Sequence, residues 1–162
     1  MTMHIDLHSP YLIAAPDYRE SSLGIQVLHR LCHMINERGG RAWMVGCTVN
    51  PDWNAPALTQ EAYEQVISSG KSWIAVYPEV TTGNPFSAPV TVRYMLNREG
   101  VIMQNAIEAS ADDPFFWYRP EFADKEPNPN ILGIECYDLS LFQDDQPVKD
   151  KDFLYLNRIP ES

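Results

Sequence analysis

The stretch Trp73–Phe86, WIAVYPEVTTGNPF, decides the fold because it joins an apolar run to a polar loop through one carboxylate. The run Trp73–Glu79 is short and apolar, which is typical of a buried strand in a parallel sheet. The loop after it holds Gly83, which permits a positive φ, followed by Asn84. An open α/β sheet builds ligand sites in this way, at the carboxyl edge of its strands.

The same alternation occurs toward the N-terminus. Tyr11–Pro16 (YLIAAP) and Arg41–Gly46 (RAWMVG) are further short apolar runs that predict strands. Between them a helix is expected to begin near Gly24 and to end at the glycines of Glu37–Gly40. Its apolar residues recur at helical spacing, at Leu28, Leu31, Cys32 and Ile35. Strand, helix and strand in this order predict a right-handed βαβ unit.

Two more helices are predicted around the opening stretch. A modest helix is expected over Thr59–Ile67, before the strand of Trp73–Glu79. A second is expected over Ser87–Gly100, with Pro89 in its first turn and Gly100 as its end. One face of this second helix would carry Val92, Met95 and Leu96.

The remaining apolar segments predict further strands. They are Val101–Ala106, Pro114–Phe122 and Asn130–Phe142, and the tail Asp150–Ser162 has room for one more. Strands that alternate with helices at this pace predict an α/β fold, a three-layer Rossmann-like domain with a mostly parallel sheet. At 162 residues, the chain is expected to form a single domain over residues 1–162.

Composition excludes several classes of protein. The chain has 22 acidic and 12 basic residues, a formal net charge of −10, which argues against nucleic acid or an anionic membrane as a partner. The three cysteines include no CxxC pair, so neither a disulfide framework nor a zinc cluster is indicated. The sequence shows no leader pattern and no apolar stretch of membrane-spanning length. A cytoplasmic protein is therefore expected.

Two motifs resemble the N-terminal domain of glycosyltransferases with the GT-B architecture, in which two Rossmann-like domains face a cleft. The first is G-x6-L-x3-L-x3-G, here from Gly24 to Gly39 with Leu31 and Ile35 between. The second resembles the Y-P-E-x3-G-N-P run of bacterial and phage-type members and extends over Tyr77–Gly100. Its matching residues are Tyr77, Pro78, Glu79, Gly83, Asn84, Pro85, Ala88, Val92, Arg93, Leu96, Asn97 and Gly100, with Asp138 and Phe142 matching a later turn.

This resemblance implies the acceptor side of a sugar transfer. Such enzymes move a hexosyl group from a nucleotide-sugar co-substrate to a sugar or glycan acceptor, with no bound cofactor and no required metal. Their donor-binding domain has no counterpart in residues 1–162. The resemblance leaves two alternatives: the N-terminal domain of a longer enzyme, or a free-standing domain without the donor half. A second domain or a separate chain would have to supply the donor site, and weak or absent transfer is expected of this chain alone.

Candidate site residues lie in the loops after the strands. Glu79 is the candidate catalytic residue, as a base on an acceptor or a partner for a sugar hydroxyl; alternatively, it binds backbone N–H groups. The first loop offers Asp17, Ser21, Ser22 and Gly24 beside a helix N-terminus that favours an anion, and the corresponding glycine of the resembled enzymes lines the cleft.

Further candidates have structural alternatives of equal or greater weight. Substrate-binding roles are expected for Thr82, Gly83 and Asn84, which plain turn chemistry also explains. Tyr118, with Arg119, is expected to be exposed and to stack on a sugar face. Arg93 is interpreted as structural support that pins Glu79 or a strand-end carbonyl, and His29 and His33 as structural rather than metal-binding residues.

A second hypothesis from a different class also fits the sequence. The chain would be a non-catalytic protein-binding or assembly domain that uses the same fold. An exposed apolar patch would then form an interface, including that of a homodimer.

Overall fold

The computed structural model of the protein describes residues 8–123 and 126–136. Within them, six strands form one sheet in the order β2-β1-β3-β4-β5-β6, and every neighbouring pair is parallel. The strands are β1 (Pro10–Ala14), β2 (Arg41–Val45), β3 (Ile74–Pro78), β4 (Val90–Met95), β5 (Phe115–Trp117) and β6 (Asn130–Ile131). Two helices, α1 (Leu23–Glu37) and α2 (Gln60–Ser68), and a short 3-10 helix, η1 (Pro120–Phe122), complete the elements. The predicted α/β Rossmann-like fold is confirmed, with fewer helices than expected.

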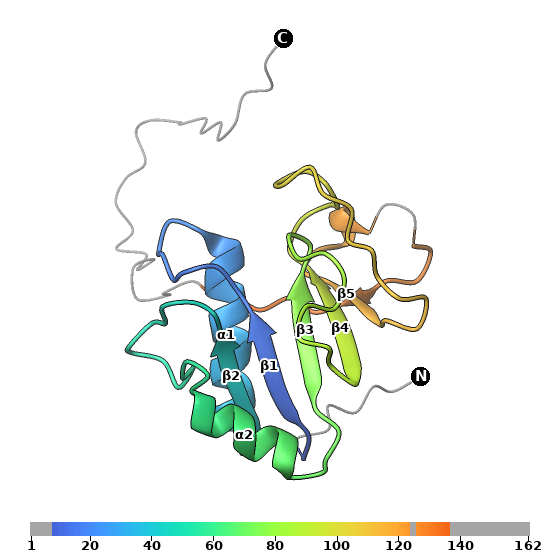
Figure 1. The fold of residues 1–162 in the computed structure, drawn as a ribbon. Coiled ribbons are helices and arrows are strands. Elements are labelled where there is room, and N and C mark those ends of the chain that lie inside the picture. The colour runs from blue at the N-terminus through green and yellow to red at the C-terminus, as the bar shows by residue number, and fades with distance from the viewer. Residues whose placement is uncertain (1–7, 124–125, 137–162) are drawn as a thin grey trace, which may run out of the picture.

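The two helices cover opposite faces of the sheet, which gives three layers over β1, β2 and β3 (Figure 1). Side chains of β1 alternate between these faces, because successive residues of a strand point to opposite sides. Tyr11 and Ile13 pack in the cluster that contains α1, whereas Leu12 and Ala14 pack in the cluster that contains Val66 of α2. The central strand is therefore apolar throughout, as its sequence predicts.

The segment Ser87–Gly100 was predicted to be helical, and this prediction is wrong. Val90–Met95 forms strand β4, which pairs with β3 on one side and β5 on the other. Its first three residues, Val90, Thr91 and Val92, are all β-branched and favour a strand. The predicted strand Val101–Ala106 is also wrong, since it forms an exposed turn and irregular chain.

The order of the strands places a topological switch point between β1 and β3. The chain passes from β1 to β2 on one side and then returns to form β3 on the other side of β1. Ligands of open α/β sheets bind at such points, beyond the carboxyl ends of the strands. Figure 1 shows the loops after β1, β3 and β4 gathered at this edge, above the arrowheads.

The last predicted segments are only partly described. Asn130–Phe142 contributes the two-residue strand β6, and Ile134 packs in the cluster on the α1 side. Asp138, Phe142 and the tail Asp150–Ser162 lie outside the described residues. Among residues 8–123 and 126–136, neither α1 nor α2 has the length and apolar character needed to cross a bilayer.

Candidate functional site

A cavity of about 610 Å³ lies at the carboxyl edge of the sheet, at the switch point between β1 and β3. One part of its lining is polar and is supplied by Arg19, Ser21, Ser22, Glu79 and Asn97. The rest is mainly apolar and includes Pro16, Leu23, Leu28, Pro78, Val80, Leu96 and Ile102. Polar groups that converge on an otherwise apolar cavity are typical of a small-molecule site.

Four of the residues predicted from sequence meet in this cavity. Ser21, Ser22 and Gly24 reach it from the loop after β1 and the first turn of α1, and Glu79 reaches it from the residue after β3. Residues 55 or more positions apart in sequence are brought together because β1 and β3 are hydrogen-bonded neighbours.

The N-terminus of α1 opens onto the cavity with unneutralised N–H groups. Ser22 is the N-cap residue, but its side chain makes no capping hydrogen bond, and the first turn carries no acidic residue. The first turn of a helix has no intrahelical acceptors for its N–H groups, and the helix dipole adds positive potential there. Together with Arg19, this end of the cavity favours an anionic or electron-rich ligand group.

Glu79 is a buried carboxyl group with 6% of its surface exposed. The Leu96 N–H donates to Glu79 Oε2 at 3.0 Å, which ties the end of β3 to the end of β4. Burial raises the pKa of Glu79, and backbone N–H groups of Glu79, Leu96 and Asn97 oppose that rise. Glu79 therefore accepts hydrogen bonds from backbone N–H groups, as the alternative interpretation expects. Glu79 also lines the cavity, and its catalytic role stays a prediction.

The raised pKa makes Glu79 a source of pH-dependent stability. The folded state holds the Glu79 proton more tightly than the unfolded chain, so the contribution of Glu79 to stability is largest below the ordinary pKa of 4.5 and falls as pH rises through the folded pKa. We expect Glu79→Gln to gain stability relative to the original protein as pH rises from below 4.5 to neutrality. Urea unfolding across this range measures the effect, with Glu64→Gln on exposed α2 surface as control. A difference that does not change with pH would contradict the prediction.

The loop that contains Thr82, Gly83 and Asn84 does not line the 610 Å³ cavity. The Asn84 side chain closes its own loop: Oδ1 accepts from the Tyr77 hydroxyl at 2.8 Å and from the Ala88 N–H at 2.9 Å. Thr82 Oγ1 donates to the carbonyl of Ala106 at 2.8 Å. Gly83 has a φ of 63°, the positive value that its sequence position predicts. The turn-chemistry alternative therefore describes Asn84, whereas Thr82 and Gly83 bond to the segment that follows β4.

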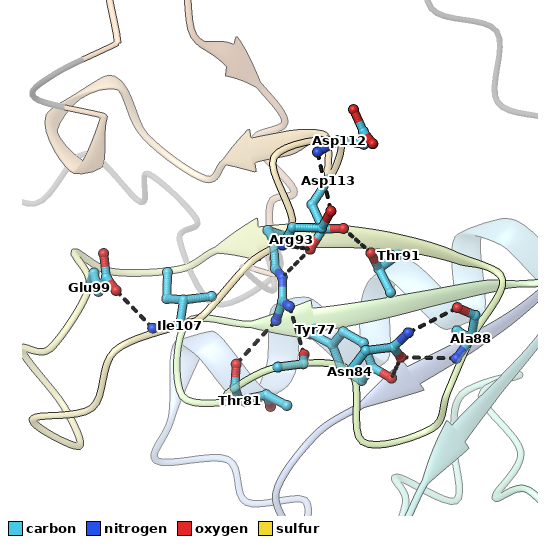
Figure 2. A network of polar contacts seen from close by, with 12 residues as sticks. Tyr77, Thr81, Asn84, Ala88, Thr91, Arg93, Glu99, Ile107, Asp112 and Asp113 are labelled. Atoms are coloured by element: carbon cyan, nitrogen blue, oxygen red, sulfur yellow. Dashed lines mark hydrogen bonds and ion pairs between the residues drawn. The ribbon is translucent and has the colours of Figure 1, made fainter.

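Arg93 lies on β4, not on a helix, and its side chain points toward this loop (Figure 2). Its guanidinium donates to the carbonyls of Thr81 and Gly83 at 3.2 and 2.6 Å. Nε forms a 2.9 Å ion pair with Asp113, and the side chains of Arg93 and Asp113 are 1% and 6% exposed. Arg93 thus has the structural role that was predicted, but it binds carbonyls of the loop rather than of the strand end, and its carboxylate partner is Asp113 rather than Glu79.

Asp113 is kept ionised by its donors. Burial alone would raise the pKa of Asp113, but hydrogen bonds from Thr91 and Arg93 and the charge of Arg93 outweigh burial, so the pKa lies below its ordinary value. The guanidinium carbon of Arg93 also lies 5.1 Å from the centroid of the Tyr77 ring. The buried cation is therefore matched by a carboxylate, two carbonyls and an aromatic face.

Asp17 and Tyr118, the other two predicted residues, stand apart from the main cavity. Asp17 is exposed, and its Oδ1 accepts the Thr48 N–H at 2.7 Å, which joins the loops after β1 and β2. Tyr118 is only 9% exposed, so the prediction of an exposed ring is wrong. Its burial follows from its place at the end of β5, where its N–H donates to the carbonyl of Met95.

A smaller cavity of about 370 Å³ adjoins the first one. Tyr118, Arg119, Glu121 and Phe122 line it together with Leu23, Gly24 and Leu96, and these last three also line the larger cavity. The carboxyl edge is therefore hollowed from β1 across to the end of β5.

Another cavity, of about 640 Å³, lies against β4 and β5 and away from the switch point. Its lining includes the stacked rings of Phe115 and Trp117, whose centroids are 5.6 Å apart, with Arg98 and Glu99 also present. It contains none of the residues predicted from sequence. It is the alternative location for a ligand.

Sequence reasoning missed Arg19, Asn97 and Ile102, which also line the main cavity. Arg19 stands in the first loop, and its charge beside Ser21 was a usable signal. Asn97 was hidden by the helix assigned to Ser87–Gly100 and Ile102 by the strand assigned to Val101–Ala106, since a strand ending at Met95 would have placed the following residues at the carboxyl edge.

His29 and His33 make hydrogen-bond contacts with backbone groups, and Cys32 and Cys47 are free thiols. His29 is fully buried, with Nδ1 2.9 Å from the carbonyl of Ile25, and His33 Nδ1 accepts the Asn54 N–H. Burial raises the pKa of Cys32 to about 12 and that of Cys47 to about 11, so neither thiol supplies a thiolate nucleophile at neutral pH. Within the described residues, no group of three or more His, Cys, Asp or Glu side chains is placed to hold a metal ion.

Comparison with known proteins assigns no family. No family model matches the chain, and no curated protein and no solved structure is significantly similar to it.

Proposed function

We propose that this chain is the acceptor-side domain of a nucleotide-sugar-dependent glycosyltransferase, and that the cavity between β1 and β3 holds the acceptor sugar. The observation that carries the proposal is the buried carboxyl group of Glu79 in this cavity, beside Ser22 and Asn97. The mixed polar and apolar lining suits a pyranose, which has hydroxyl groups around an apolar ring face. The resemblance of Tyr77–Gly100 to the GT-B motif supports the same class of ligand.

Glu79 has the properties required of a base for an acceptor hydroxyl. Its burial raises the pKa, and a carboxylate with a raised pKa accepts a proton more readily near neutral pH. Its hydrogen bond from Leu96 fixes the side chain through a neutral backbone donor, which lowers the pKa less than a charged donor would. Glu79 would thus hold the acceptor hydroxyl and receive its proton as the acceptor oxygen bonds to the donor sugar and the bond from that sugar to the nucleotide diphosphate breaks, releasing the nucleotide diphosphate.

The cavity supplies only part of a donor site. Among its described lining residues Arg19 is the only cation, and the N–H groups of the first turn of α1 add partial positive charge. A nucleotide diphosphate carries at least two negative charges at neutral pH, so one arginine leaves it poorly neutralised. We therefore expect a second domain or chain to complete the donor site, and expect this chain alone to show weak or no transfer.

Ligand-observed NMR tests the proposal directly. The protein is screened against common nucleotide-sugars, monosaccharides and oligosaccharides, in its original form and as Glu79→Gln, which keeps an oxygen that can accept from Leu96. Glu64→Gln, on the exposed face of α2, is the matched control. We expect saccharide binding that Glu79→Gln weakens and Glu64→Gln does not.

Two outcomes would count against the proposal. If no saccharide of the panel bound, or if Glu79→Gln and Glu64→Gln bound saccharide equally well, the assignment of the acceptor site to this cavity would be rejected. Turnover of a nucleotide-sugar by this chain alone would contradict the incomplete donor site.

A second candidate function is a protein-binding or assembly domain. One observation favours it: Val101, Ile102 and Met103 are consecutive apolar residues, each about half exposed or more. Sedimentation equilibrium tests this candidate, because a stable dimer that Ile102→Ser dissociates would favour assembly through this surface.

A further inference from the structure

The turn after β4 displays three large apolar side chains to solvent. Val101, Ile102 and Met103 are 55%, 48% and 63% exposed. A single exposed apolar residue is ordinary, but a run of three on a loop is unfavourable in water unless it serves a function. In the described part of the chain, the other exposed large apolar residues occur singly: Leu23, Ile67, Val90 and Ile131.

The backbone holds this apolar turn in a fixed conformation. The Gln104 N–H donates to the carbonyl of Gly100 at 3.0 Å and closes a single turn around the three residues. Both flanking residues have positive φ, 77° at Gly100 and 53° at Gln104. A non-glycine residue keeps such a conformation only where the surrounding structure holds it, and these conformations cluster at functional sites.

The base of the apolar turn is attached to the candidate site. The Ile107 N–H donates to Glu99 Oε1 at 2.8 Å, a bond drawn in Figure 2. Asn105 Nδ2 lies 3.3 Å from the carbonyl of Glu79, and the Gly83 N–H donates to the carbonyl of Ile107. The apolar turn therefore has a defined position relative to Glu79.

Ile102 connects the apolar turn to the cavity, because it is one of the lining residues together with Glu79 and Ser22. A ligand whose polar ring occupies the cavity would meet Ile102 at the edge of the lining. Any apolar extension of that ligand would then continue onto the adjacent Val101 and Met103. Leu96 and Val80 provide further apolar lining on the way.

We propose that the acceptor is amphiphilic: a sugar that occupies the cavity and carries an alkyl or lipid-like chain that lies on Val101, Ile102 and Met103. The sugar part of this inference rests on the proposed function, whereas the apolar subsite rests on the exposed turn. A chain of several methylene groups would cover the three side chains and remove apolar surface from water.

Other occupants fit the observations less well. A stable protein interface needs about 20–30 residues on each side, far more than these three. An anionic membrane surface is disfavoured by the net charge of −10. Continuity with a cavity of small-molecule size favours one ligand that occupies both places.

The test compares glycosides that differ only in chain length. Methyl, hexyl and octyl β-glucosides and β-galactosides are titrated below their micelle concentrations and followed by NMR. The variants are Ile102→Ser and Ile67→Ser, since Ile67 has the same 48% exposure but lies on α2. We expect affinity to rise at least about tenfold from methyl to octyl in the original protein and in Ile67→Ser, and less than about threefold in Ile102→Ser.

The apolar subsite would be overturned by a chain-length effect that is absent, or that both variants retain equally. It would also be overturned if Ile102→Ser abolished self-association in sedimentation, or abolished pelleting with phosphatidylcholine vesicles, since a protein or a membrane would then be the occupant. Unfolding midpoints equal to that of the original protein verify that both serine variants are folded.

The same titrations, carried out also with Glu79→Gln, separate this inference from the proposed function. Binding of the methyl glycosides that Glu79→Gln weakens, without a chain-length effect, would retain the acceptor site and reject the apolar subsite. Octyl binding that depends on Ile102 but not on the sugar or Glu79 would retain the apolar subsite and reject the sugar acceptor.

Discussion

Replacing Arg93 by methionine is expected to destabilise the folded protein by about 3–5 kcal/mol, because Asp113 would remain buried without its cation. The ion pair is 2.9 Å long and both side chains are almost fully buried. The carbonyls of Thr81 and Gly83 would also lose their donors. Urea unfolding monitored by tryptophan fluorescence at neutral pH measures the change.

Arg41→Met is the matched control for Arg93→Met. Arg41 is an exposed arginine at the first position of β2, and its loss is expected to change stability by about 0.5 kcal/mol or less. The double variant Arg93→Met, Asp113→Leu should recover part of the loss, since neither charge is then left unpaired. An Arg93→Met protein as stable as Arg41→Met would show that the buried pair does not support the fold as argued.

Replacing Ile13 by alanine should have the second-largest effect, a loss of about 2–5 kcal/mol. Ile13 has no exposed surface and lies in central strand β1, where its register partners are Met44 of β2 and Val76 of β3. Deleting its side chain opens a cavity between the sheet and α1, and the paired strands on both sides limit its collapse.

A graded series measures the Ile13 effect by urea unfolding. Ile13→Val should cost about 0.5–1.5 kcal/mol, between the original protein and Ile13→Ala. Ile67→Ala, at a half-exposed position on α2, should change stability by about 0.5 kcal/mol or less. Similar losses for Ile13→Ala and Ile67→Ala would contradict the assignment of β1 as the centre of the core.

The first half of the fold could be predicted from sequence because its elements are locally consistent. The runs that form β1 and β2 are continuous and apolar, and α1 carries its apolar residues at helical spacing with glycines after its end. Because β1 is buried on both faces of the sheet, its residues are apolar throughout. Local pattern and tertiary environment therefore give the same answer there.

The prediction for the second half of the fold was wrong at β4, because Arg93 interrupts the apolar pattern that is typical of a buried strand. Val92 and Tyr94 pack in the cluster on the α1 side, which leaves Arg93 on the opposite face. An arginine in a strand buried on both sides is compatible with the fold only if a partner neutralises it. That partner, Asp113, lies 20 residues further along the chain and follows no local pattern. Spacing of Val92, Met95 and Leu96 then favoured a helix.

Only some of the residues predicted for the candidate site line the cavity. Ser21, Ser22, Gly24 and Glu79 could be predicted because the carboxyl ends of parallel strands meet at one edge. Thr82, Gly83 and Asn84 follow the same strand, but Asn84 is bonded within its own loop and Thr82 is bonded to Ala106 in the segment after β4. Sequence shows which polar groups are present, but not which of them are already paired within the protein.

The proposed function depends on sugar binding in the cavity between β1 and β3. An amide NMR titration of the isotope-labelled protein, with the saccharide that binds best in the panel, locates the binding site. We expect the largest chemical-shift changes at Ser22, Gly24, Glu79 and Asn97, around this cavity. Changes centred instead on Phe115 and Trp117 in the cavity on β4 and β5, or no changes for any saccharide, would contradict it.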